Sequence, residues 1–272
     1  VTRGWPECVQ SIAATALLTE ESRKITFGGN LIISTPHQVR TILNQKAERW
    51  LTDSRILKYE VILLERDDLT LTTDNSLNPA AFLTGNPNPE ESTHKCLDLI
   101  SYQTRVRLDL NETAFQTGGH QFIDSSSRVI EGKRHNGYSI VDRETLTVVE
   151  SERLPNKWSA QICELFALNQ ALKSLQNQEG TIYTDSKYAF RVVHTFGKIW
   201  IEQGLIDSKG QDLVPKELIM QVLENLQLPE EIAVVHVPGH QKNPSFESQG
   251  NNLADQIAKQ AASSNFPSNP LS

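Results

Sequence analysis

The sequence GTIYTDSKYAF, residues 180–190, places a carboxylate at the point where a strand gives way to a helix. Ile182 and Tyr183 favour a strand, and Ser186 can cap a helix that begins at Lys187. In an α/β sheet, ligands and catalytic groups gather at the carboxyl ends of the strands. Asp185 is therefore either an ordinary turn or capping residue or a functional carboxylate, and the rest of the chain must decide between the two.

Composition limits the classes of function that fit the chain. Its 272 residues are enough for two domains, and its net charge of -7 means that the fold as a whole does not attract nucleic acid. Binding of nucleic acid would have to be local or assisted by metal. Cys8, Cys96 and Cys163 are too few and too scattered for a disulfide framework or a zinc knuckle, which favours a reducing compartment. Neither a signal peptide nor an apolar run long enough for a membrane span is apparent.

The first part of the chain is predicted to form a small α/β unit. Apolar residues recur at helical spacing from Val9 to Leu17. Lys24–Phe27 and Leu31–Ser34 are expected to pair as a hairpin around the turn at residues 28–30. The remaining predicted elements are helices at Val39–Leu43 and Ile56–Leu64, a strand at Leu69–Thr72 and a loop at Thr84–Glu91.

The second part is predicted to begin with an antiparallel meander. Gln121–Asp124 is expected to be a strand that ends at the aspartate and is followed by a serine-rich turn. Gly137–Val141 and Thr145–Glu150 read as a hairpin. A helix capped near Ser159 follows, with a buried stripe of leucines beside Glu164.

After residues 180–190 the sequence predicts helices up to Leu226 with breaks near Gly197, Gly204 and Gly210. Ile232–His236 reads as a buried strand. A last helix is expected to carry Asp255 in its first turn. The polar tail after residue 263 is expected to fray.

Four carboxylates could meet in this topology: Asp124, Glu164, Asp185 and Asp255. Mutual repulsion would raise their pKa values unless divalent cations neutralise them. Oxygen ligands favour magnesium or manganese, and two such ions roughly 4 Å apart would clamp the attacking and leaving oxygens of a phosphodiester. Helix-dipole compensation is the alternative reading for Glu164 and Asp255 taken singly.

Five motifs resemble, in order and spacing, the ribonuclease H domain of gammaretroviral reverse transcriptases, including those of class I endogenous retroviruses. They are IDSSS at 123–127, SAQICEL at 159–165, YTDSKYAF at 183–190, HVPGHQK at 236–242 and GNNLADQ at 250–256. Upstream, Trp5-Pro6, Pro36-His37, Arg49–Leu51, Leu77–Ala80 and Cys96–Asp98 resemble the connection domain of the same polymerases. The resemblance thus covers nearly the whole chain.

The resemblance implies an α/β protein with a ribonuclease H-like fold, in which helices flank a mixed five-stranded sheet and a smaller α/β connection domain precedes it. The implied domains are a connection domain at 1–112, a ribonuclease H domain at 113–263 and a flexible tail at 264–272. The implied partners are an RNA/DNA hybrid and the polymerase portion of the same polyprotein. A monomer in the cytoplasm or the virion, not bound to membrane, is expected.

The family also implies roles for matching residues. Asp124 and Asp255 would hold one Mg²⁺ ion, while Asp124, Glu164 and Asp185 would hold a second, with Mn²⁺ as a substitute. His240 would assist proton transfer or product release. The reaction would be hydrolysis of the RNA strand of RNA/DNA hybrids, giving 5′-phosphate and 3′-hydroxyl ends. Positions that match substrate contacts in relatives are Ser159, Gln161, Ser186, Tyr188 and Lys198, although Tyr188 fits a core aromatic equally well.

Two departures from the family pattern bear on activity. Ser125 stands where relatives carry glycine, and a glycine-like backbone there would be strained in a serine. Glu202, Gln203 and Asp207 stand where relatives are more basic, which predicts weaker binding of the hybrid. The alternative function is therefore a weak or inactive hybrid-binding or structural remnant of an endogenous polymerase. An integrase or transposase core fits poorly, because Met220 occupies the place of its glutamate.

Overall fold

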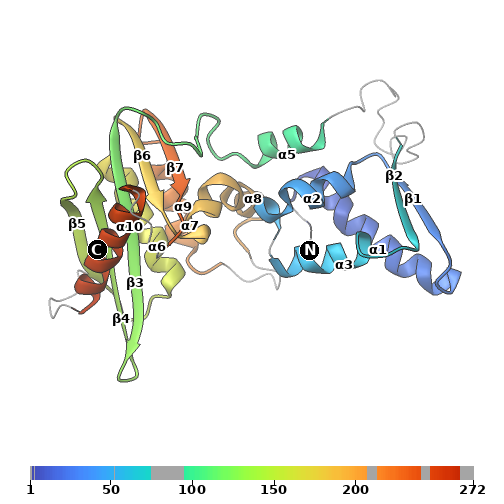
Figure 1. Ribbon diagram of the computed structural model, residues 1–272, viewed down its shortest axis with the longest axis horizontal. Coiled ribbons are helices and arrows are strands. Elements are labelled where there is room, and N and C mark those ends of the chain that lie inside the picture. The colour runs from blue at the N-terminus through green and yellow to red at the C-terminus, as the bar shows by residue number, and fades with distance from the viewer. Residues whose placement is uncertain are drawn as a thin grey trace. The chain divides into compact units, whose positions relative to one another are not determined.

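The structure is a computed structural model that describes residues 2, 4–51, 53–74, 95–206, 213–239 and 246–263. The chain forms two compact units (Figure 1). The first comprises Val1–Thr104 with Lys198–Gly204, and the second comprises Arg105–Gly197 with Leu205–Ser272. The boundary expected between residues 112 and 113 stays a prediction. The motif at 77–80, the loop at 84–91, His240 and the tail at 264–272 lie outside the described residues.

The first unit packs helices around a small parallel β-pair. Its described elements are α1 (Glu7–Thr26), β1 (Leu31–Thr35), α2 (Val39–Trp50), α3 (Asp53–Leu63), β2 (Leu69–Thr73) and α5 (Cys96–Thr104). β1 pairs in parallel with β2, with Leu31 opposite Leu69. Ile12, Ile42 and Leu63 are buried in its core, and burial of such side chains stabilises the unit by about 1.5–3 kcal/mol each.

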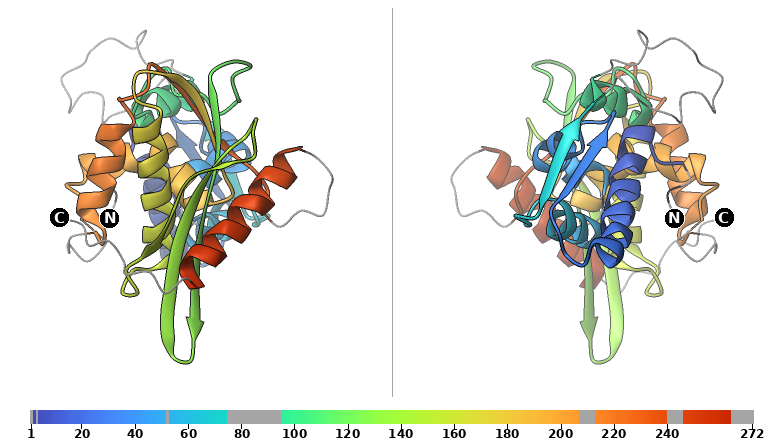
Figure 2. Two further views of the ribbon diagram at one scale, coloured as in Figure 1. Left: turned by 90° about the vertical axis from the view of Figure 1, so that its left-hand side faces the viewer. Right: turned by 90° about the vertical axis from the view of Figure 1, so that its right-hand side faces the viewer.

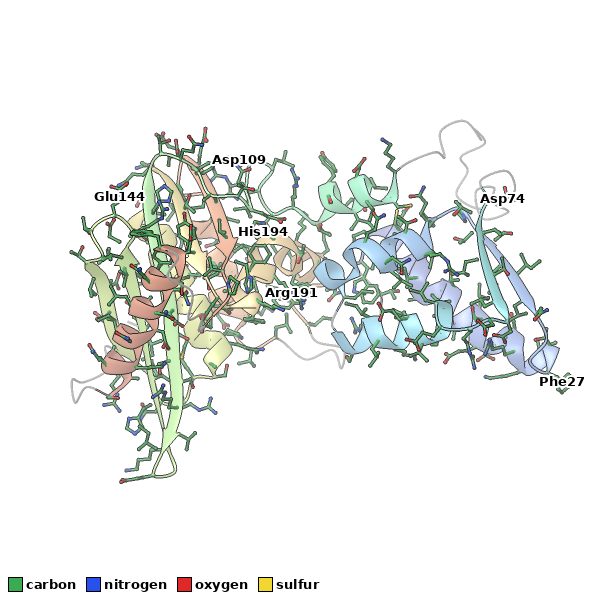
Figure 3. The ribbon with its side chains drawn as sticks, in the orientation of Figure 1. Phe27, Asp74, Asp109, Glu144, Arg191 and His194 are labelled. Atoms are coloured by element: carbon green, nitrogen blue, oxygen red, sulfur yellow. The ribbon has the colours of Figure 1, made fainter. Side chains whose placement is uncertain are left out.

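The predicted hairpin of this unit is wrong. Lys24–Thr26 form the last turn of α1, where the Thr26 hydroxyl donates to the Ser22 carbonyl at 3.1 Å and so is satisfied within the helix. Phe27, with φ 52°, ends the helix in the left-handed conformation and is fully exposed at its tip (Figure 3). β1 then pairs with a strand far along the chain, which strand propensity alone does not reveal.

The second unit is built on a mixed five-stranded sheet, which confirms the predicted fold class. The strands are β3 (Gly119–Ile130), β4 (Lys133–Asp142), β5 (Val148–Leu154), β6 (Glu179–Thr184) and β7 (Glu231–His236), in the order β5-β4-β3-β6-β7. β3, β4 and β5 form the expected antiparallel meander, whereas β3, β6 and β7 run in parallel. The β4–β5 turn is held by Asp142, whose Oδ1 accepts from the Thr145 amide at 2.8 Å.

Helices cover both faces of this sheet. They are α6 (Ala160–Ser174), α7 (Lys187–Arg191), a π-helical turn (Val192–Phe196), α9 (Lys216–Asn225) and α10 (Phe246–Ser263). α8 (Gly197–Glu202) follows the π-helical turn, and its residues from Lys198 onward belong to the first unit. Figure 2 shows α10 on one face of the sheet and α6 with α9 on the other. The leucine stripe of α6 is buried as predicted, and Ser159 caps the helix by accepting from the Ile162 amide at 3.4 Å. None of the helices in the described part of the chain has the length and apolar character that crossing a bilayer requires.

Three local expectations for the second unit are corrected. β3 does not end at Asp124 but continues through Ser125–Ser127, because these residues pair with Asn136–Tyr138 of β4. α10 begins at Phe246, so Asp255 is its tenth residue and lies in the third turn, where dipole compensation has no basis. Gly197 does not break the helices, since its backbone is right-handed helical and its amide bonds to the Val192 carbonyl. Gly204, with φ 80°, lies just beyond α8 as predicted, and Gly210 is outside the described residues.

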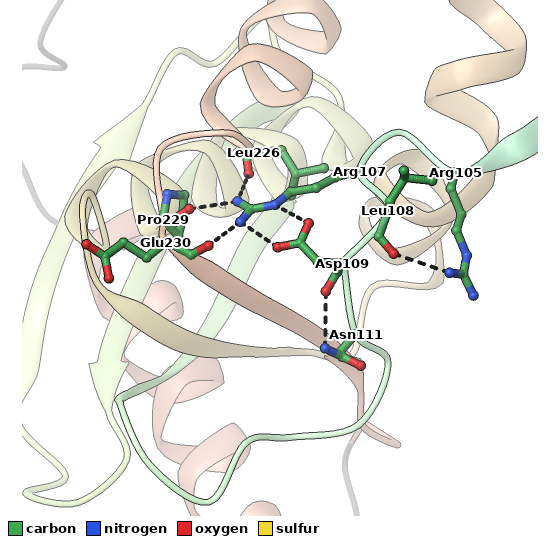
Figure 4. A network of polar contacts seen from close by, with 8 residues as sticks. All are labelled: Arg105, Arg107, Leu108, Asp109, Asn111, Leu226, Pro229 and Glu230. Atoms are coloured by element: carbon green, nitrogen blue, oxygen red, sulfur yellow. Dashed lines mark hydrogen bonds and ion pairs between the residues drawn. The ribbon is translucent and has the colours of Figure 1, made fainter. Parts of the chain in front are cut away.

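An arginine ties the start of the second unit to the segment between α9 and β7 (Figure 4). The Arg107 guanidinium donates to the carbonyls of Leu226 and Pro229 at 2.9 and 2.7 Å. It also forms a two-pronged ion pair with Asp109, and this hydrogen-bonded pairing lowers the pKa of the Asp109 carboxyl. Four residues after Arg107, Asn111 bonds to both Ile232 and Val234 on the outer edge of β7.

Candidate active site

Three carboxylates from different elements converge in the second unit. Asp124 lies in β3, Asp185 directly follows β6, and Glu164 lies in α6. β3 and β6 are parallel neighbours with Ile123 opposite Thr184, so the strand pairing itself sets Asp124 beside Asp185. One oxygen from each of the three carboxylates lies within 4.8 Å of the other two. The structure therefore brings together three of the four carboxylates that the sequence selected.

Burial and nearby negative charge favour the protonated forms of Asp124 and Glu164. Asp124 is 5% exposed, and burial, followed by the charges of Glu164, Asp185 and Asp255, raises its pKa to about 9. The Ser125 amide donates to its Oδ1 at 2.6 Å and opposes that rise. Burial likewise raises the pKa of Glu164 to about 8, against the effect of a hydrogen bond from Ser125. A nearby cation would favour the ionised forms of Asp124 and Glu164 and so lower both pKa values.

The donor set fits a divalent cation. Glu164 Oε2 is buried and has no hydrogen-bond partner among the residues that the structure describes, although its Oε1 accepts from the Ser125 hydroxyl at 2.9 Å. A buried carboxylate oxygen without a partner is costly, and a bound cation would satisfy it. Three carboxylates without thiol or imidazole favour magnesium or manganese over zinc. Asp124, Glu164 and Asp185 would hold such an ion.

Asp255 approaches the same site from α10. Its charge contributes to the raised pKa of Asp124, but its oxygens are not among those within 4.8 Å of one another in the described residues. Lys259, one turn further along the helix, forms an ion pair with it. The helix is anchored to the sheet next to Asp255, because the Ser139 hydroxyl donates to the Ala254 carbonyl at 2.7 Å. A metal role for Asp255 stays a prediction.

Two residues contact Asp185 in a way that the sequence did not predict. The buried Asn251 amide donates to Asp185 Oδ2 at 3.3 Å. A Cβ added to Gly239 would lie 2.6 Å from the same oxygen, so only glycine fits there without displacement. A signal for Asn251 was available, since it lies four residues before Asp255 and hence on the same face of the helix.

Ser125 also acts differently from what the sequence suggested. It continues β3 opposite Tyr138 with the extended backbone of a strand, so the glycine-like conformation that would have strained a serine is not present. Its hydroxyl instead bonds to Glu164. The departure from glycine thus changes the surroundings of a carboxylate rather than the backbone.

The predicted substrate contacts are spread over three helices. The Ser186 hydroxyl caps α7 by accepting from the Ala189 amide at 3.2 Å, as expected. Gln161 is exposed, whereas Tyr188 is partly buried and burial raises its pKa. Lys198 lies in the part of α8 that belongs to the first unit, and it pairs with Glu202 at 2.9 Å. The roles of these residues, and of Ser159 and His240, stay predictions.

Known proteins resemble the chain along its whole length. The model of the RNase H family matches residues 119–263. The Pol polyprotein of Feline endogenous virus ECE1 is 37% identical over 263 residues, which are 96% of this chain and 25% of that protein. The Gag-Pol polyprotein of Koala retrovirus is 38% identical over 266 residues, 97% of this chain and 15% of that protein. These relatives confirm the resemblance to gammaretroviral polymerases, of which the chain spans a quarter or less.

A solved structure agrees at the level of the fold. The crystal structure of the Prototype Foamy Virus Protease-Reverse Transcriptase CSH mutant aligns with a TM-score of 0.50 at 19% identity. The alignment covers 93% of this chain and 33% of that protein.

Proposed function

Because the chain belongs to the RNase H family, we propose that it hydrolyses the RNA strand of RNA/DNA hybrids and leaves 5′-phosphate and 3′-hydroxyl ends. The observation that carries the proposal is the cluster of Asp124, Glu164 and Asp185, whose oxygens lie within 4.8 Å of one another. Folding alone does not require three repelling carboxylates at this depth, whereas binding of divalent metal does.

The chain's residues have distinct tasks in this reaction. The carboxylates would hold divalent ions, which when bound would supply the activation of water and the stabilisation of the leaving oxygen. Asp124 and Asp185, fixed by adjacent parallel strands, and Glu164, fixed by α6, would hold the ions, with Asp255 as the fourth carboxylate. The Ser125 hydroxyl occupies Glu164 Oε1 and so competes with the metal for that oxygen, whereas Oε2 has no hydrogen-bond partner among the described residues.

Asp185 is oriented from two sides. The Asn251 amide bonds to its Oδ2, and the absence of a side chain at Gly239 leaves room for that oxygen. Asn251 is buried on α10, so the position of this helix against the sheet sets the orientation of a carboxylate that follows β6. We assign Asn251 as a positioning residue for Asp185.

The proposed partners are the hybrid and the polymerase portion of the same polyprotein. With a net charge of -7, the chain has little general attraction for phosphates, so the proposed binding of the hybrid relies on metal and on local contacts. Ser159, Gln161, Ser186 and Tyr188 would contact the backbone and the minor groove of the hybrid, where 2′-hydroxyls distinguish RNA from DNA. Two Mg²⁺ ions are the proposed cofactors, and Mn²⁺ can replace them.

Cleavage of a labelled hybrid in Mg²⁺ tests the proposal. Asp185→Asn is expected to lower the rate by more than about 100-fold, because even outer-shell partners of metal ligands contribute about 10–100-fold. Glu144→Gln is the matched control, since Glu144 is an exposed carboxylate in the β4–β5 turn (Figure 3). Intact RNA at high concentrations of wild-type protein, with the hybrid nevertheless bound, would instead identify the inactive hybrid-binding remnant.

A further inference from the structure

The first unit contains a second cluster of metal-ligating side chains, unrelated to the carboxylates. Cys8 in α1, His37 between β1 and α2, and Cys96 at the start of α5 each place one ligand atom within 4.8 Å of the other two. Cys96 Sγ and His37 Nδ1 are 3.8 Å apart. The cysteines are scattered in the sequence, but folding of the first unit brings these two together.

The surroundings of the cluster suit a bound metal. Cys8 and Cys96 are buried, with 0% and 1% of their surface exposed, while His37 is partly exposed. Of the three side chains, the imidazole is thus the one that solvent reaches. The Gln38 amide points at Cys96 Sγ at 3.5 Å, and such a donor supports negative charge on a sulfur ligand.

The ligand types select the metal. Two sulfurs and one imidazole nitrogen favour zinc and disfavour magnesium. Zinc holds sulfur at about 2.3 Å and nitrogen at about 2.0 Å, so neighbouring ligand atoms of its tetrahedron lie about 3.5 Å apart. The 3.8 Å between Cys96 and His37 is close to that spacing without any rearrangement of the helices.

We propose that Cys8, His37 and Cys96 bind one zinc ion, with water in the fourth position. Both thiols release their protons to solvent on binding, and the ion joins α1, α5 and the segment that leads into α2. Zinc therefore stabilises the first unit. Because both thiols must lose a proton, zinc binds more tightly as pH rises.

Two ordinary explanations compete with this site. Buried cysteines often serve only as small apolar core residues. Cys8 and Cys96 could also form a disulfide under oxidation, which would exclude zinc. In the first explanation the imidazole serves only as a hydrogen-bond partner of Cys96, and in the second it takes no part, whereas zinc uses all three side chains as ligands.

Cobalt(II), a spectroscopic probe for zinc sites, tests the proposal in the full chain. Reduced, metal-free protein is titrated with Co²⁺ in excess Mg²⁺, which occupies the carboxylates but does not compete for thiolates. One equivalent is expected to give thiolate-to-cobalt charge-transfer absorption and the ligand-field bands of a tetrahedral ion. Zinc is expected to abolish both signals and to raise the melting temperature of the first unit.

Variants of the three proposed ligands test whether the cobalt absorption arises from these residues. Cys8→Ser and Cys96→Ser are expected to lose the charge-transfer band, and Cys163→Ser, which changes the buried cysteine of the second unit, to retain it. His37→Gln changes a partly exposed residue and so remains informative if the cysteine variants misfold; it is expected to weaken cobalt binding more than about 100-fold.

Absence of thiolate-to-cobalt absorption in the reduced wild-type chain would overturn the proposal. So would an unchanged signal in His37→Gln, or zinc that fails to displace the cobalt. A Cys8–Cys96 disulfide that forms readily in a chain that binds no cobalt when reduced would identify a redox pair instead. None of these outcomes bears on cleavage of the hybrid, because the ligands lie in the other unit.

Discussion

Replacing Asp124 by Asn should change how the stability of the metal-free protein depends on pH. The pKa of Asp124 is raised from 3.8 to about 9 in the folded chain, and that of Glu164 from 4.5 to about 8. At a pH between the unfolded and the folded pKa of either group, the folded state keeps a proton that the unfolded state has lost. Stability is therefore greatest below the unfolded pKa values and falls as pH rises toward the folded ones.

The size of the effect follows from linkage. Each group that stays protonated only in the folded state costs at most about 1.4 kcal/mol per pH unit, and Asp124 and Glu164 are two such groups. Over the two units between about pH 5 and pH 7, Asp124 thus accounts for up to about 2.7 kcal/mol, and Glu164 for a similar amount. Asp124→Asn should halve the slope of the unfolding free energy against pH. Saturating Mg²⁺ should flatten that dependence in the wild type.

Urea unfolding in chelator, followed by hydrogen-exchange mass spectrometry of peptides from β3 and β4, measures this slope in the second unit alone. Glu144→Gln is expected to keep the wild-type slope, since its carboxylate is exposed. A flat profile for the metal-free wild type, or equal slopes for the wild type and Asp124→Asn, would refute the reasoning. Either result would mean that Asp124 ionises normally despite its burial.

Three further outcomes are expected. Ser125→Gly frees Glu164 Oε1 and should lower the Mg²⁺ concentration for half-maximal cleavage about fivefold, the equivalent of one hydrogen bond of about 1 kcal/mol; a metal titration beside Ser125→Ala checks it. Glu202→Arg releases Lys198 and should tighten hybrid binding with a steeper salt dependence, whereas Glu202→Gln should do so less. Arg107→Ala should destabilise the second unit by about 3 kcal/mol in urea unfolding, and Arg107→Lys should recover little of it.

Part of the site could be predicted from the sequence, because it depends on interactions between residues close together in the chain. Ser159 and Ser186 cap their helices as predicted, because a cap depends only on a side-chain oxygen and an amide three residues later. Asp185 follows a strand of apolar and β-branched residues and precedes such a cap, so its position also followed from its neighbours. The predicted topology then selected Asp124, Glu164 and Asp255 as its companions, and the family resemblance implied their roles.

Pairing between distant segments accounts for the failures. Ser125–Ser127 are poor strand formers, yet they stay in β3 because β4 offers them partners. Likewise β1 pairs with β2, and Leu31 and Leu69 are 38 positions apart in the chain. No local pattern could show that Cys8 and Cys96 meet, since the packing of α1 against α5 decides it. Sequence spacing does not predict such contacts between distant residues.

The bonds between Asn111 and the outer edge of β7 have a practical consequence for excising the ribonuclease H unit. An uncovered edge strand offers unpaired amides and carbonyls to other chains and promotes aggregation. A fragment that starts at residue 113 would lose Asn111 together with Arg107, and would expose β7 at Ile232 and Val234. A fragment that starts at Arg105 would retain both, and so should remain monodisperse at concentrations where the shorter one precipitates.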